Sequence, residues 1–70
     1  MLSKSEANQL QNNGRIILRS QIIKGKWVIV CKTLKGAWSR YTSEWYDSQL
    51  MADSAILSLA ENDPKIYHYK

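Results

Sequence analysis

An unbroken apolar run, WVIVC at residues 27–31, is the feature that most constrains the fold of this chain. Such a run is typical of a central strand that is covered in part on both faces. Lys24-Gly25 precedes the run and Lys35-Gly36 follows it, and glycine supplies the backbone conformation that tight turns need. The sequence therefore predicts a central strand at residues 26–34, between two turns.

Two further strands are expected beside this central one. Residues 15–23 are rich in isoleucine and partly alternate between apolar and polar side chains, which is typical of a half-exposed strand. The segment from residue 37 to residue 43 or 46 is the third expected strand. Because short turns join strands that are neighbours in the chain, these three are expected to form an antiparallel meander.

Two helices and a last strand complete the expected elements. Residues 3–13 predict a short, polar and loosely attached helix. Residues 48–61 predict the main helix, with Asp47 or Ser48 as its N-cap and Pro64 just beyond its end. Residues 65–69 alternate enough to form a short fourth strand. The apolar stripe of the main helix consists of Met51, Ala52, Ala55, Ile56 and Leu59.

The fold class expected from these elements is α+β, in one domain that spans residues 1–70. One main helix packs on an antiparallel sheet of three or four strands, in the order α-β-β-β-α-β. A chain of 70 residues buries only about 60 % of the surface that it exposes when unfolded, so its core is single and its stability marginal. The residues expected in that core are Val28, Ile29 or Val30, Cys31, Ala52, Ile56 and Leu59.

Charge is divided unevenly along the chain. Between residues 14 and 43 there are seven basic residues and no acid, whereas residues 44–63 contain acids and no base. If the two segments form different layers, the domain has one positive and one negative side. A positive side attracts nucleic acid, anionic lipid or an acidic protein. The alternative is that these bases only keep exposed strands soluble, as lysine often does.

The aromatic residues are all tryptophan or tyrosine, so every ring carries a polar group. Rings of this kind suit surfaces with one apolar and one wet side, and they can stack on the bases of a nucleic acid. Trp27 and Trp45 lie next to apolar or stripe positions and are expected on the core side. Trp38, between Gly36 and Arg40, is expected to be exposed.

Several classes of function are disfavoured. A single cysteine, Cys31, and a single histidine, His68, cannot supply a zinc site at the usual spacings. No glycine-rich phosphate loop is present, and no cofactor is expected. No apolar segment approaches the ~20 residues that a membrane span needs, and the first residues do not form a signal sequence. We therefore expect a cytoplasmic protein that is not an enzyme and does not bind membranes.

Two segments resemble a known class of DNA-binding domain. Gly25-Lys26-Trp27-Val28 enters the apolar strand, and Tyr46-Asp47-Ser48 leads into a helix with Ala52 and Ala55. This pattern resembles the three-stranded-sheet-plus-helix domains of plant ethylene-response factors and of integrase arm-binding domains. The resemblance implies a sheet that lies in the major groove of DNA. The positions that it assigns to DNA contact are Arg15, Arg19, Lys26, Trp38 and Arg40.

The function expected is that of a small binding module that docks nucleic acid, DNA rather than RNA, on a basic sheet face. An alternative is a protein-binding modulator or inhibitor, of the phage or mobile-element type. A third alternative is a homodimer that pairs its strand edges at residues 65–69. The order of elements is also similar to that of double-stranded-RNA-binding domains, but Glu44 and Asp47 stand where those have bases. The residues expected to contact nucleic acid are Arg15, Arg19, Lys24, Lys26, Lys32, Lys35, Trp38, Arg40 and Tyr41.

Overall fold

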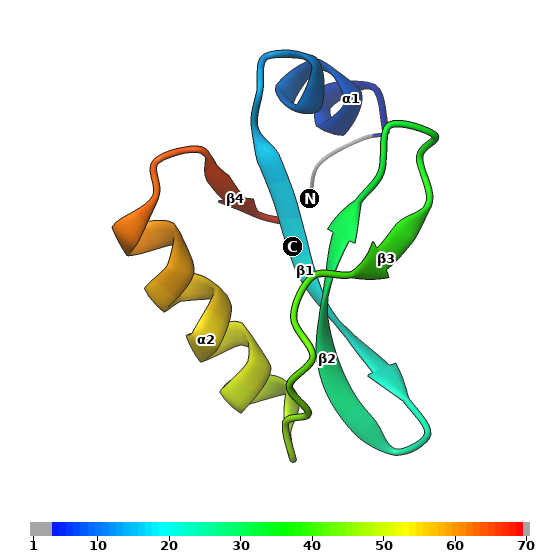
Figure 1. Ribbon diagram of the computed structural model, residues 1–70, viewed down its shortest axis with the longest axis vertical. Helices are drawn as coiled ribbons and strands as arrows, with labels where there is room; N and C mark the ends of the chain where they lie inside the picture. The colour runs from blue at the N-terminus through cyan, green and yellow to red at the C-terminus, as the bar shows by residue number, and fades with distance from the viewer. Residues whose placement is uncertain (1–3, 70) are drawn as a thin grey trace.

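A computed structural model describes residues 4–69 as a four-stranded sheet with one long helix packed on it (Figure 1). The strands lie side by side in the order β3-β2-β1-β4. This arrangement confirms the expected α+β class and the expected order of the elements. Their bounds are α1 Lys4–Asn12, β1 Ile16–Ile23, β2 Lys26–Lys32, β3 Trp38–Arg40, α2 Gln49–Asn62 and β4 Ile66–His68.

The β1–β2 hairpin is the longest pairing in the sheet, and its turn is the one that the sequence predicts. Lys24 and Gly25 both have positive φ, at 52° and 80°, which is the backbone of a type I′ turn. Glycine adopts this conformation freely, while lysine at such a φ is strained. The turn fixes the register, in which Ile23 pairs with Lys26 and Leu18 with Cys31.

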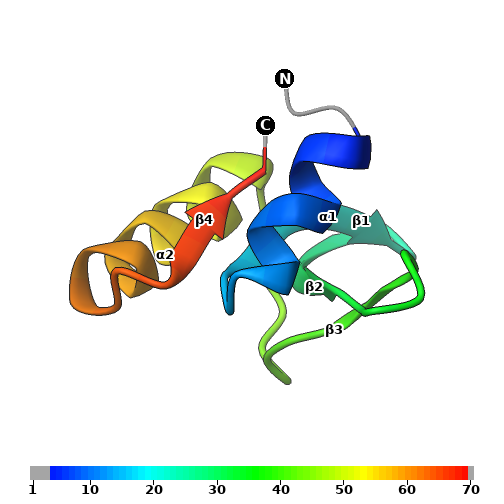
Figure 2. The same ribbon diagram turned by 90° about the horizontal axis from the view of Figure 1, so that it is seen from above.

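Strand β4 shows that the sheet is mixed, so the prediction of an all-antiparallel sheet was wrong. β4 pairs in parallel with β1, Ile16 opposite Ile66 and Leu18 opposite His68. Helix α2 runs back along the sheet in the direction opposite to β1, so the strand that follows it runs the same way as β1 (Figure 1). Seen from above, α2 and β4 lie on one side of the molecule and β3 on the other (Figure 2).

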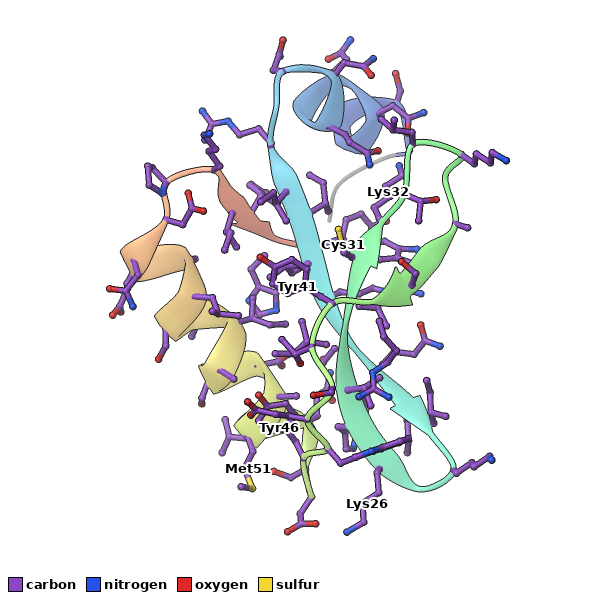
Figure 3. The ribbon with its side chains drawn as sticks, in the orientation of Figure 1. Lys26, Cys31, Lys32, Tyr41, Tyr46 and Met51 are labelled. Atoms are coloured by element: carbon purple, nitrogen blue, oxygen red, sulfur yellow. The ribbon has the colours of Figure 1, made fainter. Side chains whose placement is uncertain are left out.

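Helix α2 begins where the sequence predicts and buries part of the expected stripe. Ser48 is its N-cap, and the Ser48 Oγ accepts a hydrogen bond from the Met51 N–H at 3.2 Å. Ala52 and Ile56 are fully buried, and Leu59 packs against the same cluster. Met51, the first residue of the expected stripe, is exposed near the start of the helix, where Figure 3 labels it.

The core lies between α2 and the sheet, with Leu18, Ile29, Ile56 and Ile66 at its centre. Val28 and Val30 are buried as well, although their side chains point to the other side of β2. Both faces of β2 are therefore covered, as the apolar run predicts. Cys31 is only partly buried, where it packs against the core cluster.

The third strand is shorter than predicted, because the chain bends away after Arg40. Residues 41–45 are irregular, and the backbone returns to the sheet at Tyr46. There the N–H and C=O of Tyr46 exchange two hydrogen bonds of 2.8 Å with Trp27. β2 likewise ends at Lys32 and not at residue 34.

Helix α1 confirms the predicted N-terminal helix, and the part of that prediction on residues 1–3 falls outside the described residues. It lies over the end of the sheet where β1 begins and β2 ends (Figure 1). The Gln11 amide donates a 2.6 Å hydrogen bond to the Lys32 carbonyl there. Across residues 4–69, neither helix has the length and apolar character needed to cross a membrane.

Candidate nucleic-acid interface

The sheet face that points away from α2 is called the far face, and strand alternation defines its side chains. Ser20 and Ile29 are cross-strand partners on the α2 side, where the Ser20 Oγ is 2.7 Å from the Asp53 Oδ1 of that helix. Their neighbours along each strand therefore point to the far face. The far-face residues of the three meander strands are Ile17, Arg19, Gln21, Ile23, Lys26, Val28, Val30, Lys32, Trp38 and Arg40.

On the far face, one arginine stacks on an aromatic ring. The Arg19 guanidinium carbon lies 4.2 Å from the ring centroid of Trp38, and this ring meets Tyr69 edge-on with 5.3 Å between centroids. Trp38 comes from β3 and Tyr69 follows β4, so their contact spans the two central strands. It helps to cover Ile17 and Val30, which are buried on this face.

A second stack lies beside the first, at the edge of the sheet. The Arg40 guanidinium carbon is 4.6 Å from the ring centroid of Trp45. Arg40 is held there by two further bonds, since its Nε donates to the Thr42 carbonyl and its Nη2 to the Glu44 carbonyl, both at 3.1 Å. Cation–π contacts at exposed sites contribute about 0.5–1 kcal/mol each, enough to orient both groups.

Lys26 adds a third positive charge to this face, where it forms an ion pair with an acid. Its Nζ lies 2.6 Å from the Asp47 Oδ1, and both side chains are exposed. The hydrogen bond from Lys26, and secondly its positive charge, lower the pKa of Asp47. Asp47 therefore stays ionised over the neutral range and competes with any anionic ligand for Lys26.

Lys32 belongs to the far face by alternation, yet its assignment to an exposed binding surface was wrong. Its side chain is only 5 % exposed. Trp38 is the cross-strand neighbour of Lys32 on this face, and Gln11 of α1 hydrogen-bonds the Lys32 carbonyl at the same end of the sheet. Lys26 and Lys32 stand at opposite ends of β2 (Figure 3). Only the Lys26 end is open to a ligand.

The other expected contact residues are spread around the molecule. Lys24 is exposed in the β1–β2 turn, and Lys35 is exposed in the turn at the other end of β2. Arg15 precedes β1, where its Nη1 donates a 2.8 Å hydrogen bond to the Pro64 carbonyl. Tyr41 is exposed after β3, out of phase with Trp38 and Arg40. The structure thus places Arg19, Lys26, Trp38 and Arg40 on one face. It does not place Lys24, Lys35, Arg15 and Tyr41 with them.

Two aromatic residues of the far face, Trp45 and Tyr69, were not among the contact residues predicted from the sequence. Trp45 was expected on the core side, but its ring is 52 % exposed. The reason is local: Tyr46 packs against the core cluster while Trp45, its neighbour, turns outward to Arg40. The sequence signal for an outward Trp45 is alternation: if Tyr46 is taken as strand-like and facing the core, its neighbour faces outward.

Other ionisable side chains of the domain carry shifted pKa values without forming a site. Burial raises the pKa of the Cys31 thiol, whose Sγ donates to the Lys32 carbonyl at 3.5 Å. Burial and a 3.1 Å hydrogen bond to Glu44 raise the pKa of Tyr46. Both groups are therefore protonated at neutral pH. Among residues 4–69, no three histidine, cysteine or acidic side chains are grouped so as to hold a metal ion.

Comparisons with family models, with curated proteins and with solved structures find no match to this chain. The resemblance to sheet-type DNA-binding domains therefore remains a prediction.

Proposed function

We propose that this protein binds nucleic acid through the far face, with single-stranded DNA as its first ligand. The observation that carries the proposal is the pair of arginine–tryptophan stacks, Arg19 on Trp38 and Arg40 on Trp45. Proteins that bind single strands combine positive charge along the backbone with aromatic rings on which bases stack. Arginine extends such a stack through its own planar group.

A single strand suits this face better than a duplex does. Trp38 and Tyr69 meet over the centre of the sheet, so a wide and flat surface of free arginines is not available for a major groove. The half-exposed ring of Trp45 lies instead at the sheet edge, where an unstacked base can reach it. Arg40 and Lys26, on the same face, are placed to contact the phosphates on either side.

The charge distribution supports the same ligand. No acidic residue occurs between residues 14 and 43, which include all three meander strands. Asp53 belongs to α2 on the opposite side of the sheet, and Glu61 lies near the end of that helix. Asp47 lies on the far face and offsets the charge of Lys26, so the positive charge there comes from Arg19 and Arg40. The far face therefore attracts polyanions over a range of about 8–10 Å at physiological salt.

The test is the affinity of a labelled oligothymidine for the protein, measured by fluorescence anisotropy at several salt concentrations. Trp45→Ala should weaken binding by roughly 1–3 kcal/mol, the loss of one stacked base, and Trp45→Phe should restore much of it. Arg40→Gln should weaken binding and reduce the salt slope by about 0.7, the value of one phosphate contact on a single strand.

Lys65→Gln is the matched control, because it removes one exposed charge in the turn between α2 and β4, which belongs to neither stack. It should leave the salt slope nearly unchanged. The proposal fails if oligothymidine, duplex DNA and RNA all bind no tighter than about 10⁻⁴ M at 0.15 M salt, the level of ordinary non-specific binding. Tryptophan and arginine are also enriched at the centres of protein interfaces, so that result would favour the protein-binding alternative.

A further inference from the structure

Strand β1 is paired over most of its length on one side and over less than half of it on the other. β2 pairs with Leu18 to Ile23, whereas β4 pairs only with Ile16 to Leu18. The Ile16 N–H and the Leu18 C=O bond toward β4, at 2.8 and 2.7 Å. By alternation, Ser20 and Ile22 direct their N–H and C=O groups toward the same edge, where no strand of the described residues pairs with them.

A groove of about 650 Å³ lies at this unpaired edge. Arg19 and Tyr69 line it from the far face, and Ser20 and His68 line it from the α2 side. Because residues of both sheet faces line it, the groove is a notch in the sheet where β4 stops. Its volume is in the range of about 300–1,000 Å³ that is usual for ligand sites. Its remaining wall is α2, through Gln49, Asp53 and Leu57.

On the α2 side, the notch and the strand edge beside it offer a ligand one polar group, a carboxylate, and one apolar side chain. The Asp53 Oδ1 accepts a 2.7 Å hydrogen bond from the Ser20 Oγ and lies 3.4 Å from the His68 Nε2. These contacts fix a partly exposed carboxylate in the wall of the groove. Two residues along the strand from Ser20, on the same face, the side chain of Ile22 is exposed. Large exposed aliphatic side chains beside a strand edge are typical of docking surfaces.

We propose that this notch binds an extended peptide segment of a partner protein, added to the sheet as a strand on the free edge of β1. Main-chain hydrogen bonds to Ser20 and Ile22 hold the segment, which is the general mode of strand addition. The pleat then directs alternate side chains of the peptide toward α2. One of these, lysine or arginine, meets the Asp53 carboxylate, and the next on that face, an aliphatic residue, packs on Ile22.

An isolated segment fits this edge better than a second copy of the chain does. The Ser20 part of the free edge lies in the notch, which α2 also lines. A second copy would bring its own β1 edge, set back beside its own α2 in the same way. A single extended strand has no such obstacle, and its basic side chain complements the acid in the wall.

The test uses short labelled peptides of about seven residues, the length of one strand, in four matched forms. They carry lysine or glutamate at one position and leucine or serine two positions later. We expect the lysine–leucine peptide to bind at least about tenfold more tightly than the glutamate–serine peptide. Asp53→Asn should remove the preference for lysine and leave the preference for leucine.

The decisive variant is Ile22→Pro, which removes the outward N–H as well as the isoleucine side chain but no hairpin bond, because the hairpin bonds of β1 are made by the residues on either side. It should weaken peptide binding about tenfold, the value of one or two main-chain hydrogen bonds. Ile22→Thr retains the N–H and should lose only the leucine preference. Oligothymidine binding should be unchanged in both variants, which separates this proposal from the first.

Three results would overturn the proposal. One is that no peptide of the set binds below about 1 mM. Another is that Ile22→Pro, shown to be folded by its amide spectrum, binds peptides as the unchanged protein does. The third is a dimer in sedimentation experiments that Ile22→Pro abolishes, which would assign the edge to a second copy.

Discussion

Lys26 and Asp47 form an exposed lysine–carboxylate pair on the far face. An exposed pair of this kind contributes little to the free energy of unfolding. Its importance is for binding, since the carboxylate occupies the charge that a phosphate would use. If the far face binds nucleic acid as proposed, Asp47 therefore weakens its hold on a phosphate.

Asp47→Asn should raise the affinity for oligothymidine and steepen its salt slope by about 0.7, because Lys26 becomes available for one phosphate. Glu61→Gln, which removes an acid near the end of α2, is the matched control and should leave the slope unchanged. Anisotropy titrations of both variants provide the comparison. Equal effects in the two variants would show that overall charge, and not the release of Lys26, controls binding.

The same pair has a defined pH dependence. The pKa of Asp47 is lowered in the folded state by Lys26, so the pair stabilises the fold above the unfolded pKa of about 3.9. This stabilisation is lost as the pH falls through the lower, folded pKa. The small difference in unfolding midpoint between the protein and Asp47→Asn should therefore be constant near neutral pH and disappear in acid.

At the scale of elements, the parts of the fold that depend on local sequence were predictable. The type I′ turn follows from Gly25, the N-cap of α2 from Ser48, and the buried strand from its apolar run. The direction of β4 was not predictable, because a three-residue strand shows alternation but not which neighbour it joins. That choice is made by the path of α2 across the sheet.

The candidate site also has features that the sequence predicts and features that it does not. Alternation along three strands places Arg19, Lys26, Trp38 and Arg40 on one face, and the sequence contains that alternation. Lys32 is buried, and no local pattern in the sequence signals this burial. Tyr69 reaches Trp38 only because β4 stands at the opposite edge of the sheet.

Two adjacent residues of α2 test how the helix packs on the sheet. Ile56 is fully buried at the centre of the core, and Leu57 is 49 % exposed on the next position. Ile56→Ala should lower the free energy of unfolding by roughly 2–5 kcal/mol, since it leaves a cavity among Leu18, Ile29 and Ile66. Leu57→Ala should cost much less. Urea titrations of the two variants give the free energies of unfolding. Equal losses would show that α2 packs on the sheet through a different face.

At the scale of the whole molecule, the sheet separates two environments. Its α2 side holds the apolar core and the Ser20–Asp53–His68 cluster. Its far side holds the two arginine–tryptophan stacks and Lys26. In so small a domain the core already needs most of the large aliphatic residues. The half-exposed indole of Trp45 is the ring that the proposed stacking would use.

Amide and indole chemical shifts of the ¹⁵N-labelled protein, followed during titration with oligothymidine at about 0.15 M salt, test the far face most directly. The account predicts saturable shifts at Arg40 and at the indole N–H groups of Trp38 and Trp45, with little change at Ala52 and Ile56 in the core. Trp45→Ala should abolish most of these shifts while the remaining spectrum stays folded. Shifts confined to α2, or none at any residue, would contradict it.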